Sequence, residues 1–168
     1  MTRTMLTLLA GMFAIGCSAH AMAAGDNHVL SISWYKDGKA ILATKTILKD
    51  SFGSVTPYST REGESVGYRV CKRVGDTQTL SALQQFVGRS LTVLPRAERD
   101  GMFVVSVSAE DTTYKGRHTE GNAECQSQVI DTSGLMAKDI TVDLHNGQTV
   151  DVPLRDEHYS LRLTLSTE

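Results

Sequence analysis

The sequence predicts an all-β protein: an antiparallel β-sandwich or barrel-like domain of about eight short strands, with at most one short helix near residues 77–87. Two observations carry this prediction. Apolar and polar residues alternate with a period of two along most of the chain after residue 23. Turn-forming dipeptides also recur between the apolar runs, at Asp37-Gly38, Asp100-Gly101 and Asn146-Gly147. Short strands separated by such turns are typical of sandwiches and barrels, and they leave the strand order open.

Residues 1–23 have the composition of a bacterial-type export signal. Arg3 supplies a short positive start, and an apolar run follows over residues 5–16. Ala21 and Ala23 offer the small side chains that a signal peptidase recognises. The run is shorter than the roughly 20 residues that span a bilayer. We therefore expect residues 24–168 to form a single exported domain, periplasmic or secreted, with no transmembrane segment in the mature chain.

A second cleavage site, just before Cys17, stays open. Ile15 and Gly16 fit a lipoprotein signal, whereas Ala14 stands where leucine is more usual. Cleavage there would retain Cys17 as a lipid anchor and give a membrane-anchored lipoprotein. The soluble product is the favoured interpretation.

The charge of the mature chain disfavours two classes of partner. Residues 24–168 carry 16 basic and 19 acidic side chains, a net charge of −3 with histidine neutral. No basic stripe indicates a nucleic-acid surface. No basic amphipathic stretch indicates a helix lying on a membrane. We expect no nucleic-acid partner.

The first two strands are predicted as a hairpin. Leu30, Ile32 and Trp34 alternate with serines, and Asp37-Gly38 follows. A two-residue turn there sets Trp34 opposite Ile41, so that apolar residues share one face. The second strand is expected over residues 39–48.

Several strands and one helix are predicted in the middle of the chain. Residues 51–67 are rich in turn formers, with a short strand expected at 55–59, and a further strand is expected at 66–74. Leu80, Leu83 and Val87 then fall at helical spacing, between a possible cap at Asp76 and a stop at Gly88, so a helix is expected at 77–87. Residues 91–94 and 102–109 form the next predicted pair, and the second of these strands is expected to be central because both of its faces are apolar.

The last third of the chain is predicted as an exposed loop followed by four strands. Residues 112–124 are polar and form the expected loop. Strands are expected at residues 125–131, 139–145, 149–154 and 159–166. Pairing Leu144 with Val150 requires a three-residue loop, which predicts a bulged hairpin. The alternative is that these two strands belong to different sheets.

Cys71 and Cys125 are predicted to form a disulfide. They are the two cysteines that remain after ordinary signal cleavage, and an exported chain meets an oxidising environment. No Cys-x-x-Cys spacing favours a redox role.

Other chemistry leaves little trace in the sequence. The histidines lack zinc-ligand spacing, and no calcium loop, serine elbow or phosphate-binding glycine loop is present. We therefore predict no catalytic residue, metal or cofactor. His118 and Glu120 share the loop at 112–124 and are the candidates for contact with a ligand.

The function expected from these features is binding. The favoured interpretation is a non-enzymatic exported domain that binds a protein or cell-envelope partner, with an exposed sheet edge available to accept a partner strand. A small exported hydrolase without a recognisable motif is the first alternative, and it predicts a histidine hydrogen-bonded to a carboxylate or serine in a cleft. The lipid-anchored lipoprotein is the second alternative. The sequence leaves the oligomeric state open.

Overall fold

A computed structural model describes residues 26–168 and confirms the all-β sandwich. The predicted export signal, both cleavage sites and Cys17 lie outside the described residues. Within the described part there are eight strands and no helix. The strands are β1 (His28–Lys36), β2 (Lys39–Lys49), β3 (Tyr58–Val74), β4 (Thr77–Arg99), β5 (Met102–Asn122), β6 (Cys125–Leu144), β7 (Thr149–Val152) and β8 (Tyr159–Thr167).

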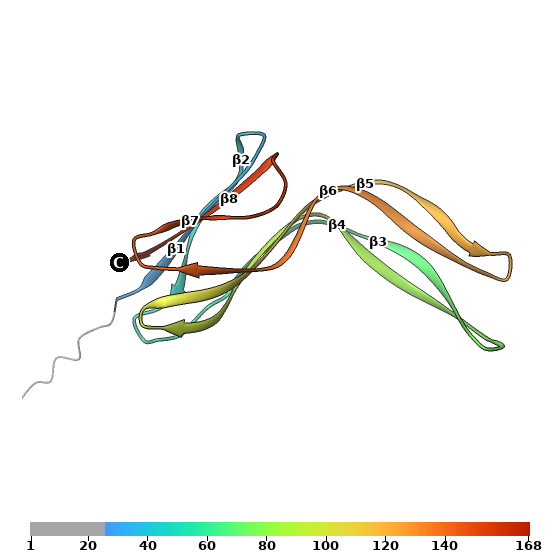
Figure 1. Cartoon of the computed structure of the whole chain (residues 1–168), viewed down its shortest axis with the longest axis horizontal. Helices are drawn as coiled ribbons and strands as arrows, with labels where there is room; N and C mark the ends of the chain where they lie inside the picture. Colours follow the sequence, from blue (N-terminus) through green and yellow to red (C-terminus); the bar gives the residue numbers. More distant parts are fainter. Residues whose placement is uncertain (1–25) are drawn as a thin grey trace, which may run out of the picture.

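The strands form two antiparallel sheets of four. The first has the order β2-β1-β8-β7, and the second has the order β3-β4-β5-β6. Figure 1 shows the sheets face to face over one half of the molecule, which we call the sandwich. The strands of the second sheet continue beyond it as a long projection. We call this projection the arm and define it as residues 63–88 and 112–134.

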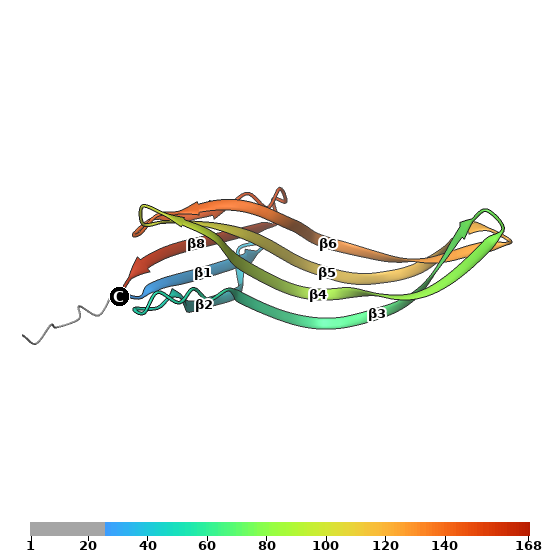
Figure 2. The ribbon, with the colours of Figure 1, turned by 90° about the horizontal axis from the view of Figure 1, so that it is seen from below.

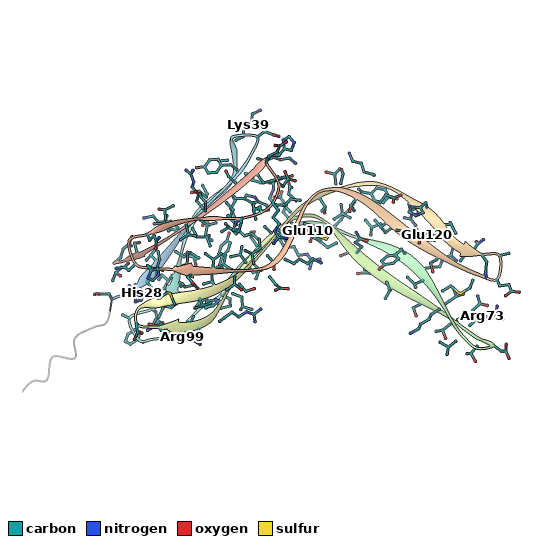
Figure 3. All side chains as sticks on the ribbon, viewed as in Figure 1. His28, Lys39, Arg73, Arg99, Glu110 and Glu120 are labelled. Carbon is teal, nitrogen blue, oxygen red and sulfur yellow. A yellow bond between two sulfur atoms is a disulfide. The ribbon has the colours of Figure 1, made fainter. Side chains whose placement is uncertain are left out.

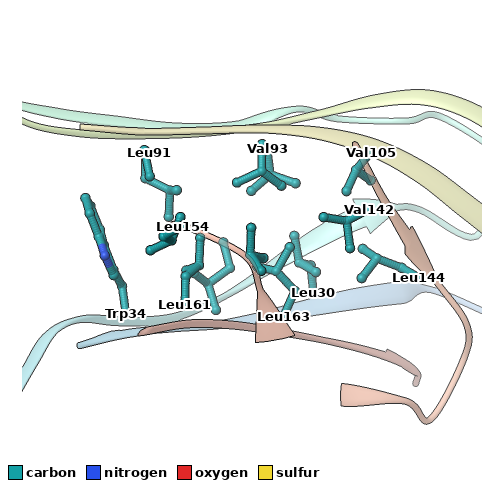
Figure 4. Close-up of a cluster of buried hydrophobic side chains, with 14 of the residues drawn as sticks. Leu30, Trp34, Leu91, Val93, Val105, Val142, Leu144, Leu154, Leu161 and Leu163 are labelled. Atoms are coloured by element: carbon teal, nitrogen blue, oxygen red, sulfur yellow. The ribbon is translucent and has the colours of Figure 1, made fainter. Parts of the chain in front are cut away.

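The hydrophobic core lies wholly in the sandwich. Leu30, Trp34 and Leu163 of the first sheet are fully buried against Leu91 and Val105 of the second. Figure 4 shows these side chains filling the space between the two layers. Inward-facing residues along β1, β8 and the ends of β4 and β5 alternate as the period of two predicted.

The arm has a different construction. The β4–β5 ladder stops at the pair Arg89–Asp111, and Thr112 Oγ1 makes one further contact by accepting a hydrogen bond from the Gly88 N–H at 3.2 Å. Beyond this point β3–β4 and β5–β6 run on as two separate hairpins (Figure 1). In the view of Figure 2 the two hairpins cross near their tips.

Three glycines lie where the strands bend between the sandwich and the arm. Gly63 and Gly88 face each other across β3 and β4, with φ angles of 154° and 143°. Each backbone lies so close to the other that a Cβ on either glycine would collide with it. Gly134 has a φ of 120°, and a Cβ there would meet the carbonyl oxygen of Asp111. Only glycine can adopt these positive φ angles and also allow such a close approach of the neighbouring backbone at low cost.

The predicted helix at residues 77–87 is wrong, because the segment is the first half of β4. Leu80 and Leu83 fall on opposite faces of the hairpin, opposite Cys71 and Tyr68 respectively. Both are exposed in the arm, so their spacing reflects no buried helical face. Residues 112–124 are likewise strand through Asn122, not a loop. The predicted short strands at 125–131 and 139–145 are one strand, β6.

Two details of register also differ. The two-residue turn at Asp37-Gly38 is present, but a bulge at Ile41 sets Trp34 opposite Leu42 instead. The bulged hairpin at Asn146-Gly147 is wrong. The strands on either side of it, β6 and β7, belong to different sheets, as the alternative stated.

Candidate functional site

A buried carboxylate lies where the arm leaves the sandwich. Asp111 of β5 has a side chain that is only 11% exposed. Its Oδ2 accepts hydrogen bonds from Lys36 Nζ and from the Tyr159 hydroxyl, both at 2.9 Å. Arg89 Nε lies 3.4 Å from the other oxygen. The cluster therefore ties β1 and β8 of the first sheet to β4 and β5 of the second.

The charges in this cluster stabilise each other. Burial alone would raise the pKa of Asp111, but hydrogen bonds from Lys36 and Tyr159 and the charge of Arg89 lower it below its ordinary value. The hydrogen bonds to Tyr159 and Asp111 raise the pKa of Lys36. Burial raises the pKa of Tyr159. At neutral pH the cluster holds an ionised Asp111 and a protonated Lys36, so it serves as a structural lock between the sheets.

A shallow recess of about 420 Å³ opens beside this lock, lined by Lys36, Asp37, Gly134, Asp156, His158 and Tyr159. His158 Nδ1 lies 2.8 Å from Asp37 Oδ1, and this hydrogen bond raises the pKa of His158. Both side chains are mostly exposed. The pair is one that general acid–base chemistry requires, but no serine, threonine or cysteine lines the recess to act as its nucleophile.

A longer groove continues from the same recess. It has a volume of about 590 Å³ and follows residues 134–141 of β6 and residues 153–156 of the β7–β8 connection. It shares Gly134 and Asp156 with the smaller recess. Buried Leu135, Ala137 and Leu154 contribute apolar atoms to its lining.

The two predicted ligand-contact residues come together on the arm. His118 and Glu120 project from one face of β5, and His118 Nε2 lies 3.0 Å from Glu120 Oε1. His118 Nδ1 lies 3.0 Å from Asp131 of β6, a residue that the sequence analysis missed. Hydrogen bonds to Asp131 and then to Glu120 raise the pKa of His118. Asp131 is 13 residues away in sequence, and only the β5–β6 register reveals the contact.

His28 is separate from this cluster. Its ring packs at a tilt against the Phe103 ring in the sandwich, with the ring centroids 5.1 Å apart. In the part of the chain that the structure covers, no three His, Cys, Asp or Glu side chains are arranged to hold a metal ion.

The predicted disulfide between Cys71 and Cys125 is confirmed. It joins β3 to β6 near the tips of the two arm hairpins, with Cα atoms 5.4 Å apart. Ser127 Oγ accepts a hydrogen bond from the Cys71 N–H at 3.0 Å. Arg73 forms an ion pair with Glu124, whose carbonyl oxygen accepts a hydrogen bond from Gln78 at 2.8 Å. These contacts close the far end of the arm.

The arm exposes large apolar side chains. Val74 is 68% exposed, Leu80 is 65% exposed, and Leu83 is also exposed. Figure 3 shows side chains projecting from both faces of the arm around the labelled Arg73 and Glu120. Buried apolar residues of the arm are Val87 and Ile130, and neither belongs to the core cluster of the sandwich.

Comparison with known proteins gives no relative. No protein-family model, curated protein or solved structure matches this chain. Residues 26–168 contain no helix that is long and apolar enough to cross a membrane.

Proposed function

We propose that this protein is an exported, non-enzymatic domain that binds a protein or cell-envelope partner through its arm. The observation that carries the proposal is the arm itself. Its two hairpins extend beyond the last β4–β5 pair and present Val74, Leu80 and Leu83 to solvent. Leu80 and Leu83 lie on opposite faces of the hairpin, so the arm offers exposed apolar side chains to a partner on either side.

The arm is ordered although it adds nothing to the main core. A two-stranded hairpin alone is marginally stable in water. Here two hairpins are held together by a disulfide and by polar contacts between β3 and β6. An element ordered in this way can bind a partner with little loss of conformational entropy. The disulfide also supports export, because such bonds persist in oxidising compartments.

Side chains of the arm are a better contact surface than a free sheet edge. The edge strand β2 carries Lys39, Lys45 and Lys49, and lysines on an edge discourage strand addition. The edge of β6 is interrupted by a bulge at residues 138–139. In the arm, the backbone N–H groups of Arg69 and Cys71 on β3 already donate to Gln128 and Ser127 side chains.

Affinity capture from the native envelope or medium tests the proposal. The mature protein should retain its partner, and the double substitution Leu80→Ser with Leu83→Ser should weaken capture at least tenfold, as loss of a hot spot does. Ile47→Ser is the matched control, because Ile47 is a similarly exposed apolar residue on the sandwich. Equal loss in both variants, or in neither, would contradict a role for the arm. Reduction of the disulfide should weaken capture as well.

The lipid-anchored form remains a separate proposal about the N-terminus. Mass spectrometry of the mature chain distinguishes the two products. Ala24 as the first residue excludes the lipoprotein, and a diacylated Cys17 establishes it. Either product leaves the arm free to bind.

A further inference from the structure

One aromatic side chain stands in solvent at the end of the sandwich opposite the arm. Phe52, in the β2–β3 connection, is 95% exposed. The turn that carries it is fixed, because the Asp50 carboxylate accepts hydrogen bonds from the N–H groups of Phe52 at 3.0 Å and Ser54 at 2.8 Å. The Ser51 N–H donates to Asn27 Oδ1 at 2.9 Å. An aromatic side chain on an ordered turn costs little backbone freedom on binding and is a typical anchor of an interface.

A recess that fits such a ring lies on the same surface. It has a volume of about 210 Å³ and is lined by Val55, Pro95, Arg96, Ala97, Glu98 and Phe103. An apolar cavity of about 150 Å³ is large enough to hold benzene. The recess can therefore accept a phenyl group. The molecule's own Phe52 does not fill it, since that ring is almost wholly exposed.

We propose that Phe52 of one copy of this chain inserts into the recess of a second copy, and reciprocally, to form a two-fold dimer. Val55, which lines the recess, follows Phe52 by three residues, so ring and recess lie on one connection. A two-fold interface requires such a self-complementary patch, in which each partner supplies both the protruding and the receiving group.

The chemistry around the ring favours a second copy over a lipid surface. Asp50 stands beside the ring, and the Lys49–Glu98 ion pair, 2.8 Å long, borders the recess. A membrane-binding loop usually surrounds its apolar residues with unpaired Lys and Arg. The molecule itself carries a recess large enough for the ring, which favours a second copy of this chain as the partner.

The dimer would leave both arms free. Figures 1 and 2 place the β2–β3 connection at the end of the sandwich farthest from the arm. In Figure 3, Arg99 marks that end and Arg73 marks the arm. Two copies joined through Phe52 therefore present two arms to a partner, and bivalent engagement strengthens binding without any new contact. The dimer does not depend on the proposed function, because its test reads only self-association.

Sedimentation velocity on the mature protein, from low micromolar to near-millimolar concentration, is the first test. The wild type should show a concentration-dependent monomer–dimer equilibrium. Phe52→Ala, which removes the ring, and Ala97→Phe, which fills the recess, should each raise the dissociation constant at least tenfold. Tyr114→Ala is the control, because Tyr114 is an exposed aromatic residue of the arm, and it should leave the equilibrium unchanged. A wild type that stays monomeric throughout would overturn the proposal, as would a Phe52→Ala variant that associates normally.

Photo-crosslinking identifies the occupant directly. A benzoylphenylalanine placed at position 52 of the full chain, in the producing cells, should give a covalent dimer whose cross-linked peptide covers residues 95–103. Cross-linking to lipid or to a different protein instead would overturn the dimer and name the true occupant of the ring.

Discussion

The four strands β3 to β6 run through both the sandwich and the arm, but the two regions are stabilised in different ways. In the sandwich, alternate residues of β4 and β5, such as Leu91 and Val105, are fully buried against the first sheet. In the arm, the same strands have no facing sheet, and side chains such as Leu80 on both faces meet solvent. The comparison shows that paired strands can extend beyond the hydrophobic core where a disulfide and polar contacts hold them together. The arm depends on the disulfide and on polar contacts between hairpins, whereas the sandwich depends on apolar burial.

The largest difference between the two regions should appear in a matched pair of leucine substitutions. Leu163→Ala in the sandwich removes a fully buried side chain and should lower the free energy of unfolding by about 3–5 kcal/mol. Leu80→Ala in the arm should change it by no more than about 0.5 kcal/mol. Urea unfolding followed by tryptophan fluorescence measures both, because Trp34 lies in the core. Similar losses in the free energy of unfolding for the two variants would contradict the proposed difference between sandwich and arm.

Removing the disulfide should affect the arm before the sandwich. Cys71→Ser with Cys125→Ser opens a loop with a sequence separation of 54 residues and should cost up to about 4 kcal/mol on the chain-entropy estimate. Hydrogen exchange should show lost protection over residues 63–88 and 112–134, while β1 and β8 stay protected. Uniform loss across both regions would show that the arm and sandwich unfold as one unit.

The lock between the two regions should be sensitive to acid. Because the pKa of Asp111 is lowered in the folded state, its contribution is present above the ordinary value of 3.8 and is lost as the pH falls through the folded value. Asp111→Asn should lower stability by about 2–3 kcal/mol at pH 7.

The acid dependence supplies the control for that substitution. The difference between the wild type and Asp111→Asn should shrink toward strongly acidic pH, where Asp111 is protonated. Asp151→Asn breaks only the exposed pair with Arg162 and should cost less than about 0.5 kcal/mol. A difference for Asp111→Asn that is independent of pH would show that its charge is not what holds the lock.

The smallest expected effect is a change in the pKa of His118 in the arm. NMR titration should place the pKa of His118 above its ordinary value of 6.5, and Asp131→Asn should lower it. Asp37→Asn should lower the pKa of His158 and leave His118 unchanged. Since the pKa of His118 is raised, its pairing favours the folded arm below pH 6.5, and this effect is lost as the pH rises through the folded value. A His118 titration unaffected by Asp131→Asn would show that the pair does not form in solution.

The sequence predicted the part of the fold that has a core. Leu30, Ile32 and Trp34 alternate because one face of β1 packs on the second sheet, and the predicted pair at 91–94 and 102–109 lies in the same layer. The arm escaped prediction because most residues on both of its faces are exposed, so burial imposes no regular period of two on its sequence. Leu80, Leu83 and Val87 fell at helical spacing without sharing a buried face, and the polar residues 112–124 were interpreted as a loop.

The candidate sites, like the fold, could be predicted from the sequence only in part. Cys71 and Cys125 were predictable because they are the two cysteines of residues 24–168, the predicted mature chain. The lock was not, because Lys36 and Asp111 are 75 residues apart and each is an ordinary charge in its local sequence. Asp131 was missed beside His118 for the same reason. Phe52 drew no notice in the sequence because only the folded turn shows how fully its ring is exposed.

The unbroken passage of β4 and β5 through the bend has a mechanical consequence. The disulfide near the tip connects β3 to β6, so a pull on either hairpin is shared by all four strands. Those strands run directly into the sandwich, where their backbone hydrogen bonds lie across the direction of the pull. A load along the arm therefore reaches the sandwich through all four strands of the second sheet together. The disulfide at one end and the sandwich at the other thus tie the two hairpins of the arm together at both ends.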